Sequence, residues 1–243
     1  MTTRIVLSLG GNSAASDECY VAALSLPGFD LEVCPVYPTA SAEEVRELLR
    51  GSSGLVLSGG ADVDPVRYGE EPAGAEMKYV NPSRDAVEFA ALAEADAREL
   101  PVFAICRGAQ VLNVHRGGAL LQDIGRAHRD GRPQEEKWRA FHEVELLAGS
   151  RVARTMAGQR VQTNSRHHQA LDPGRLGQGL TVVGRCPTDG VIEAVEAPGA
   201  RLVLGVQWHP ENMALAPDAS PEREQARRLF AAFAEAARIC AIS

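Results

Sequence analysis

The sequence predicts an α/β fold, in which a single doubly wound domain holds a largely parallel central sheet flanked by helices. Short apolar runs at 55–57, 102–105 and 202–208 are typical of strands buried on both faces of such a sheet. Stretches with helical apolar spacing alternate with these runs through the first half of the chain. The chain shows no internal repeat and no linker biased enough to separate two domains, so we expect one domain over 1–243.

Each element of the first half follows from a local pattern. Ser41 and Glu44 form a capping-box pattern, and Gly51 ends the helix that they begin. An Ala- and Glu-rich stretch at 83–100 predicts a long helix that leads directly into the next buried strand. The remaining expected elements are strands at 4–9, 31–37, 55–57 and 102–105, helices at 14–26 and 109–114, and a loop at 10–13.

The second half is less regular. A charged segment at 125–139 predicts a surface loop, which is either simply solvated or borders a substrate entrance. Alternation of polar and apolar residues at 142–146 indicates a half-exposed strand. The other expected elements are a short extended segment at 119–124, a hairpin of 182–185 with 191–196, a strand at 202–208 and an amphipathic helix at 221–237.

Composition indicates the class of protein. The 243 residues are 45% hydrophobic and 23% charged, which is typical of a soluble globular protein with a sizeable core. A formal net charge of −7 argues against a nucleic-acid surface, and no apolar run approaches the roughly 20 residues that span a membrane. The first ten residues resemble a strand rather than a signal peptide, and the five cysteines form no CxxC pair. We therefore expect reduced thiols and a cytoplasmic protein.

Cys106 lies where a buried strand, a sharp turn and a helix are expected to meet. That arrangement holds a nucleophile at the carboxyl edge of a sheet and directs the amide dipoles of the following helix at it. A helix N-terminus favours the reactive thiolate. The alternative at this point is a buried cysteine that packs as a small hydrophobic residue.

A segment with polar or reactive groups follows each of three predicted strands. The segment 58–60 offers unhindered backbone amides, 106–107 offers the thiol, and 209–211 offers an imidazole and a carboxylate. Because the carboxyl ends of parallel strands share one rim of an open sheet, these segments can converge. Each feature alone has an ordinary explanation, as a tight turn, a buried cysteine or a hydrogen-bonded histidine. Together they favour acyl-transfer chemistry.

The chemistry of the three segments is complementary. His209 is placed to take the proton from Cys106, and Glu211 is placed to orient the ring and stabilise its charged form. The N–H groups of Gly60, or its neighbour Gly59, and of Arg107 are candidates for binding the oxyanion of a tetrahedral intermediate.

Five motifs in this order resemble the class I glutamine amidotransferase-like superfamily, and within it the γ-glutamyl-γ-aminobutyrate hydrolase family of peptidases. They lie at 59–65, 105–110, 117–118, 164–169 and 209–211. The motifs at 105–110 and 209–211 are shared across the superfamily, whereas those at 59–65 and 164–169 are more specific to the hydrolase branch. The resemblance runs from about Leu7 to the C-terminal helix and implies the superfamily's α/β fold.

The resemblance also implies roles for individual residues. The catalytic triad maps onto Cys106, His209 and Glu211, with oxyanion amides at Gly60 and Arg107. The residues that map onto recognition of the γ-glutamyl group are Gly59, Gln110, Asn164, Ser165, Arg166, His167 and His168. A metal site is not expected, because adjacent histidines on an extended chain point to opposite faces and no Cys or carboxylate has ligand spacing to them.

The implied activity is hydrolysis of a γ-glutamyl amide through a thioester, with release of glutamate. It requires no cofactor. The leaving amine would be γ-aminobutyrate or a related product of polyamine breakdown, although Asn212 and Met213 replace a common aromatic residue on the leaving-group side. The expected partner is a small γ-glutamyl substrate, with no nucleic acid and no membrane, and assembly as a homodimer is left open. Two alternatives remain: a glutaminase subunit that feeds ammonia to a separate synthetase, and a catalytically silent binding or regulatory module.

Overall fold

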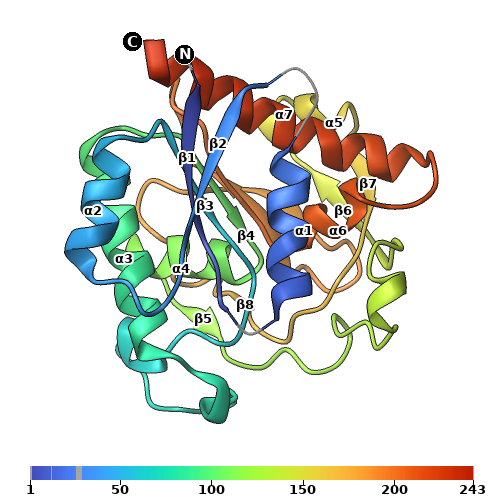
Figure 1. Ribbon diagram of the computed structural model, residues 1–243. Helices are drawn as coiled ribbons and strands as arrows, with labels where there is room; N and C mark the ends of the chain where they lie inside the picture. The colour runs from blue at the N-terminus through green and yellow to red at the C-terminus, as the bar shows by residue number, and fades with distance from the viewer. Residues whose placement is uncertain (1, 12, 26–28, 243) are drawn as a thin grey trace.

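A nine-stranded sheet forms the centre of the protein. The structure, a computed structural model, describes residues 2–11, 13–25 and 29–242. Asn12 of the expected loop 10–13 and Leu26 of the expected helix 14–26 therefore lie outside the described residues. The strands follow the spatial order β2-β1-β3-β4-β11-β10-β9-β6-β7 (Figure 1). Their bounds are β1 Thr3–Ser8, β2 Leu31–Val36, β3 Gly54–Leu57, β4 Val102–Ile105, β6 His142–Leu146, β7 Arg160–Thr163, β9 Thr181–Arg185, β10 Ile192–Glu196 and β11 Val203–Val206.

The parallel part of the sheet contains β2, β1, β3, β4 and β11, as the apolar runs predict. Leu57 pairs with Ala104, and Ile105 pairs with Val206, so β3, β4 and β11 end at the same level. The polar segments that follow these three strands therefore meet at one rim, which confirms the expected convergence.

The rest of the sheet is antiparallel, and of this part the sequence predicts only the hairpin that β9 and β10 form. Strands β10, β9, β6 and β7 each pair antiparallel with their neighbours beyond β11. The connections from β9 to β10 and from β10 to β11 are too short to hold a crossover helix, and a short connection permits only an antiparallel pair.

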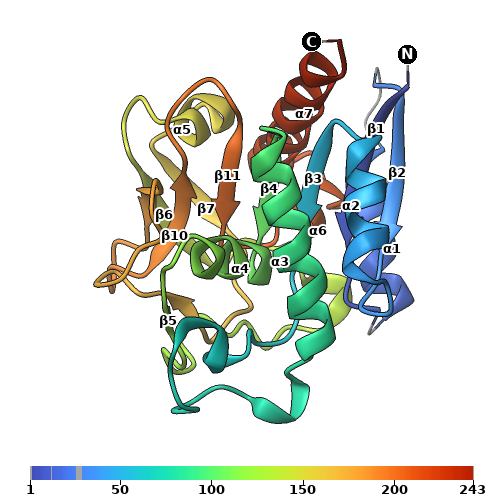
Figure 2. The ribbon, with the colours of Figure 1, turned by 90° about the vertical axis from the view of Figure 1, so that its left-hand side faces the viewer.

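Helices cover both faces of the sheet (Figures 1 and 2). Their bounds are α1 Ala14–Leu24, α2 Ala42–Arg50, α3 Pro82–Ala97, α4 Arg107–His115, α5 Arg151–Met156, α6 Pro210–Ala214 and α7 Pro221–Ile242. Side chains alternate along β1: Ile5 and Leu7 join a core with α1, α5, α6 and α7, whereas Val6 joins a core with α2, α3 and α4. Such two-sided burial explains the continuous apolar runs. Among the described helices, none combines the length and apolarity needed to span a membrane.

Local sequence patterns place most helix boundaries correctly. The capping box is present: Glu44 N–H donates to Ser41 Oγ over 3.2 Å, and Ser41 N–H donates to Glu44 Oε2 over 2.7 Å. The last helix continues to Ile242, five residues beyond the predicted end. The extended segment expected at 119–124 is only the strand β5 Leu120–Leu121, which pairs with β8 Ala170–Leu171.

The charged segment 125–139 is not a purely solvated loop. His128 and Asp130 are buried, and Asp130 N–H donates to Ser165 O over 3.0 Å. His167 N–H in turn donates to His128 O over 3.1 Å. Because these backbone hydrogen bonds join the segment 125–139 to the segment 164–169 in both directions, its polar composition reflects attachment to the rest of the protein rather than free solvation.

Gly108 allows α4 to approach β3 closely. A Cβ at this position would lie 2.5 Å from Leu57 O and 2.7 Å from Leu57 Cβ, closer than any real contact. We expect Gly108→Ala to lower the free energy of unfolding by about 1–3 kcal/mol, because the helix must shift away from the strand. Gly131→Ala is the control, since a Cβ there meets no described atom within 4 Å. Urea denaturation of both variants measures the difference, and equal midpoints would contradict the close-packing argument.

Candidate active site

Cys106 occupies a strained turn between β4 and α4. Its φ of 52° and ψ of −107° lie outside the ordinary regions for a residue with a side chain. Its N–H donates to Val206 O over 2.7 Å, which continues the β4–β11 pairing one residue past the strand. The thiol is thereby held at the rim of the sheet, 5% exposed, at the start of a helix. Strain of this kind persists where the surrounding structure determines the conformation.

His209 follows β11 and caps the short helix α6. Its Nδ1 lies 2.7 Å from Glu211 Oε1, and the amide of Asn212 donates to the same oxygen over 2.7 Å. Because a carboxylate only accepts, Nδ1 carries the proton in this contact. The other ring nitrogen, Nε2, is then available to exchange a proton with a nucleophile. A carboxylate that orients the histidine in this way is the third member of a catalytic triad.

The electrostatic environment favours a charged His209 ring. Burial opposes the charge, but the Glu211 carboxylate and the Cys106 thiol outweigh it and raise the pKa of His209 to about 10. A charged imidazole next to a cysteine sulfur is the arrangement of a cysteine–histidine nucleophile pair. Gln207 also donates its side-chain amide to Cys106 Sγ over 3.6 Å. The three residues that sequence analysis placed in a triad are thus brought together.

Two backbone amides remain for an oxyanion. Gly59 N–H donates to the Tyr20 hydroxyl over 2.9 Å, so this amide is not available to an oxyanion. Contact of Gly59 with substrate stays a prediction. Gly60 N–H has no acceptor among the described residues. Arg107 N–H is the first amide of α4, which lacks an acceptor within its own helix. The chemistry available at this rim is therefore attack by a thiolate with stabilisation of the developing oxyanion.

Tyr20 is a residue that the sequence analysis missed. It lies on α1, is 3% exposed, and its hydroxyl lies 3.5 Å from His209 Nδ1 as well as accepting from Gly59. Burial, with the negative charge of Glu211, raises the pKa of Tyr20 well above its ordinary value, so the hydroxyl keeps its proton. A single tyrosine in the helix expected at 14–26 carries no signal that distinguishes it from a core residue.

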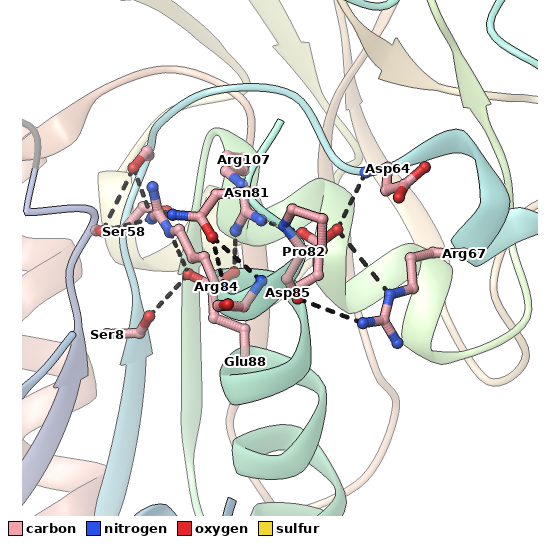
Figure 3. A network of polar contacts seen from close by, with 12 residues as sticks. Ser8, Ser58, Asp64, Arg67, Asn81, Pro82, Arg84, Asp85, Glu88 and Arg107 are labelled. Atoms are coloured by element: carbon pink, nitrogen blue, oxygen red, sulfur yellow. Dashed lines mark hydrogen bonds and ion pairs between the residues drawn. The ribbon is translucent and has the colours of Figure 1, made fainter. Parts of the chain in front are cut away.

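A network of buried ion pairs supports both oxyanion segments (Figure 3). The Arg107 side chain lies fully within the protein and pairs with Asp85 and Glu88 of α3. Arg84 pairs with Glu88 over 2.8 Å.

The same network reaches the segment before the cysteine strand. Arg84 donates to Gly59 O over 2.9 Å and to Ser58 Oγ over 3.1 Å. A Cβ on Gly60 would overlap the Arg84 guanidinium, so this position requires glycine. The two arginines hold the pKa of the Glu88 carboxyl below its ordinary value despite complete burial. The network therefore fixes the segment 58–60 relative to the start of α4.

A cavity of about 370 Å³ opens above the thiol. Its polar lining includes Asp17 from α1, Lys137 from the segment 125–139, and Arg166. Burial and the neighbouring Arg166 charge lower the pKa of Lys137. The other lining residues are Gly10, Ser13, Ser16, Tyr20, Gly59, Gly60, Arg84, Cys106, His209, Glu211 and Asn212. The cavity thus joins the nucleophile to cationic and carboxylate groups that come from several elements.

Asn164 positions the imidazole rather than lining this cavity. Its Oδ1 accepts from His209 N–H over 2.8 Å, and its Nδ2 donates to His209 O over 3.0 Å. The same amide donates to Lys137 O over 2.8 Å. Asn164 therefore links the backbone of His209 to the segment that carries Lys137, and its expected role in substrate contact is corrected accordingly.

The other residues assigned to substrate recognition are used within the protein. Gln110 donates its amide to Gln169 O over 3.1 Å and to Gln207 Oε1 over 3.3 Å. Ser165 donates to His128 O over 2.8 Å. His167 lies 3.6 Å from Glu193 through its Nε2, and His168 Nε2 lies 2.9 Å from Asp62 Oδ1. Of these four residues, His168 borders a second cavity of about 370 Å³, which also contacts Gly60 and Arg166.

Contrary to the expectation from sequence spacing, both adjacent histidines have carboxylate partners, Glu193 for His167 and Asp62 for His168. These carboxylates lie 26 and 106 positions away in the chain, so no spacing rule within the motif finds them.

Comparisons with known proteins agree with this geometry. A family model described as Peptidase C26 matches residues 27–211. The candidate glutamine amidotransferase Rv2859c of Mycobacterium tuberculosis is 40% identical over 197 residues, which cover 79% of this chain and 61% of that protein, less than two thirds of its length. The gamma-glutamyl-gamma-aminobutyrate hydrolase PuuD of Escherichia coli is 34% identical over 185 residues, which cover 72% of this chain and 70% of that protein. The glutaminase domain of Trypanosoma brucei CTPS, solved with bound acivicin, superposes with a TM-score of 0.64 at 19% identity over 96% of this chain and 94% of that domain, which supports the fold alone.

Removing one negative charge from the buried ion-pair network should lower the free energy of unfolding. Glu88→Gln keeps the side-chain shape but leaves the buried Arg84 and Arg107 guanidinium groups with one carboxylate fewer. We expect a loss of about 3–5 kcal/mol in the free energy of unfolding, because the uncompensated charge stays out of water. Glu43→Gln, in an exposed surface pair, is the control and should leave the urea midpoint nearly unchanged. A similar midpoint shift for both variants would contradict the argument.

The raised pKa of His209 depends on Glu211. Because the folded-state pKa of about 10 lies above the ordinary value of about 6.5, the stabilisation from the charged ring is complete below about pH 6.5 and is lost as pH rises through about 10. Glu211→Gln should lower the pKa of His209 toward its ordinary value and remove this alkaline loss of stability. Proton–carbon NMR of the His209 ring in histidine-labelled protein measures the titration, with His209→Asn used to assign the signal. An unchanged titration in Glu211→Gln would refute the assignment.

Proposed function

Because the chain belongs to the peptidase C26 family of the class I glutamine amidotransferase-like superfamily, we propose that it hydrolyses the γ-glutamyl amide bond of a small γ-glutamyl amine, such as γ-glutamyl-γ-aminobutyrate. The observation that carries this proposal is the His209 ring held between the Cys106 thiol and the Glu211 carboxylate at the mouth of the cavity. The similarity to the E. coli hydrolase supports the choice of substrate class.

In the proposed first half-reaction, the Cys106 thiolate attacks the γ-carbonyl carbon. The carbonyl electron pair moves to oxygen, and the Gly60 and Arg107 N–H groups stabilise the oxyanion. When the C–N bond breaks, the departing amine takes a proton from His209 Nε2, and a γ-glutamyl thioester remains on Cys106. Glu211 stays ionised throughout and keeps the ring in orientation.

In the second half-reaction, water replaces the amine. The neutral His209 ring takes a proton from the water as the oxygen attacks the thioester carbonyl. The C–S bond then breaks, glutamate leaves, and the thiolate and the charged imidazole are restored. The chain's own residues supply every proton transfer in this sequence.

The charges of the cavity suit a substrate with both a carboxylate and an ammonium group. Lys137 and Arg166 together form a carboxylate site, and Asp17 on the opposite element α1 suits an α-ammonium group. This division of charge matches the γ-glutamyl group.

A glutaminase is the second candidate, because the M. tuberculosis relative is named as a candidate glutamine amidotransferase. The chemistry at Cys106 is then the same, but the leaving group is ammonia rather than an amine. The two candidates differ in what the leaving-group side of the cavity must accommodate, so substrate preference separates them.

The first test is glutamate release from γ-glutamyl-γ-aminobutyrate, other γ-glutamyl amines and free glutamine. We expect the γ-glutamyl amines to be cleaved in preference to glutamine, and Cys106→Ala to lose at least about a thousandfold in kcat, because the thioester cannot form. Cys34→Ala, a partly exposed cysteine on β2, is the matched control and should keep the wild-type rate.

Two outcomes would overturn the proposal. Preference for glutamine would assign the chain to the glutaminases, and absence of turnover on all substrates by folded, reduced protein would favour a binding or regulatory module.

A further inference from the structure

Three buried residues and one half-buried residue outside the active site form a compact group, here called the histidine–glutamate cluster: His128, His167 and Glu193 are buried, and His142 is half-buried. Three imidazole nitrogens converge on Glu193 Oε1. The distances are 3.1 Å from His142 Nε2, 3.3 Å from His128 Nδ1 and 3.6 Å from His167 Nε2. Glu193 is 1% exposed, and His128 and His167 are 2% and 4% exposed. The mechanism proposed above uses none of these side chains.

The outer contacts of two rings determine where their protons lie. His167 Nδ1 lies 2.9 Å from Gln169 O, and a carbonyl oxygen can only accept, so Nδ1 carries the hydrogen. His128 Nε2 lies 2.9 Å from Asp189 Oδ2 and carries its hydrogen for the same reason. In their neutral forms, both rings therefore present an unprotonated nitrogen to the Glu193 carboxylate.

The unprotonated nitrogens of His128 and His167 and the buried Glu193 carboxylate repel one another unless a positive charge lies between them. Protonation of both rings does not complete the contacts, because His167 Nε2 lies too far from Oε1 to donate a normal hydrogen bond and has no other partner among the described residues. Glu193 Oε2 and His142 Nδ1 also lack partners there. A single divalent cation at the centre satisfies the inward nitrogens and the carboxylate together.

The spacing fits a tetrahedral ion. Ligands about 2.0–2.1 Å from Zn²⁺ lie about 3.3 Å from one another, which the three nitrogen–oxygen distances bracket. Ligand atoms of His128, His142 and Glu193 all lie within 4.8 Å of one another, whereas His167 is not part of this group. The Gln169 carbonyl and the Asp189 carboxylate match the outer acceptors that orient metal-binding histidines.

We propose that the histidine–glutamate cluster is a site for Zn²⁺ or a similar divalent cation, held by His128, His142 and Glu193, with His167 Nε2 next to it. The three ligands come from the segment 125–139, from β6 and from β10. The segment 125–139 also carries Lys137, so the ion would hold this part of the cavity wall to the sheet. This inference does not depend on the proposed function.

Metal uptake by the full chain tests the site. Protein freed of metal with a chelator is titrated with Co²⁺, which reports four-coordinate binding by its visible absorption, and with Zn²⁺ in competition. We expect one equivalent to bind, with displacement of Co²⁺ by Zn²⁺. Wild-type protein that takes up no stoichiometric Co²⁺ or Zn²⁺ would overturn the proposal, whatever its activity.

Variants locate the ligands. His142→Gln and Glu193→Gln should each weaken binding at least about a hundredfold, and Asp189→Asn, which removes an outer acceptor, about 10- to 100-fold. His115→Gln is the matched control, because His115 lies on α4 against Asp96. Circular dichroism establishes that each variant is folded. Asp189→Asn leaves the ligands in place, so it still tests the site if a ligand variant fails to fold.

A second set of potential ligands shares one residue with the cluster: His128, Cys186 and Asp189. Cys186→Ser separates the two sets and should leave Co²⁺ affinity unchanged. Loss of binding in Cys186→Ser with full binding in His142→Gln would overturn the assignment to the histidine–glutamate cluster.

Discussion

The buried ion pairs of Arg107 with Asp85 and Glu88 are the interaction on which the active-site geometry depends. Arg107 begins α4, directly after the nucleophile, while both carboxylates lie on α3. Arg84 completes the network and binds the carbonyl of Gly59. Two guanidinium groups face two carboxylates, so the buried charges cancel. The desolvation of four charges offsets much of their attraction, and the network serves mainly to specify one arrangement of the two oxyanion segments.

The strained turn at Cys106 is possible because of this support. Its N–H is held by Val206 O at the end of β11, and His209 follows three residues later. The pairing of β4 with β11 therefore brings the thiol and the imidazole to the same rim, although about a hundred residues separate them. Asn164 then fixes the backbone of His209 from the other side. A sheet register, a buried ion network and one amide together position the reacting groups.

The second half of the chain forms a polar shell over this rim. Segments 125–139 and 164–169 exchange backbone and side-chain hydrogen bonds and bury several charged or polar groups, including His128 and Ser165. Buried polar groups of this kind are costly unless every partner is in place, so they specify the conformation of the segments. This explains how a stretch with the composition of a loop carries Lys137 and Arg166 at defined places in the cavity wall.

The sequence by itself determined the parallel half of the sheet, the helices that cover it, and the meeting of Cys106, His209 and Glu211. Apolar runs and caps are local signals, and parallel strands necessarily end at a common rim. Only the tertiary structure decided that Gln110 and Asn164 bind other parts of the protein, that Tyr20 occupies the Gly59 amide, and that His167 faces Glu193. Those contacts join polar side chains across long separations in sequence. Periodicity reports which face of an element is buried, but the partner of a buried polar group depends on the folded chain.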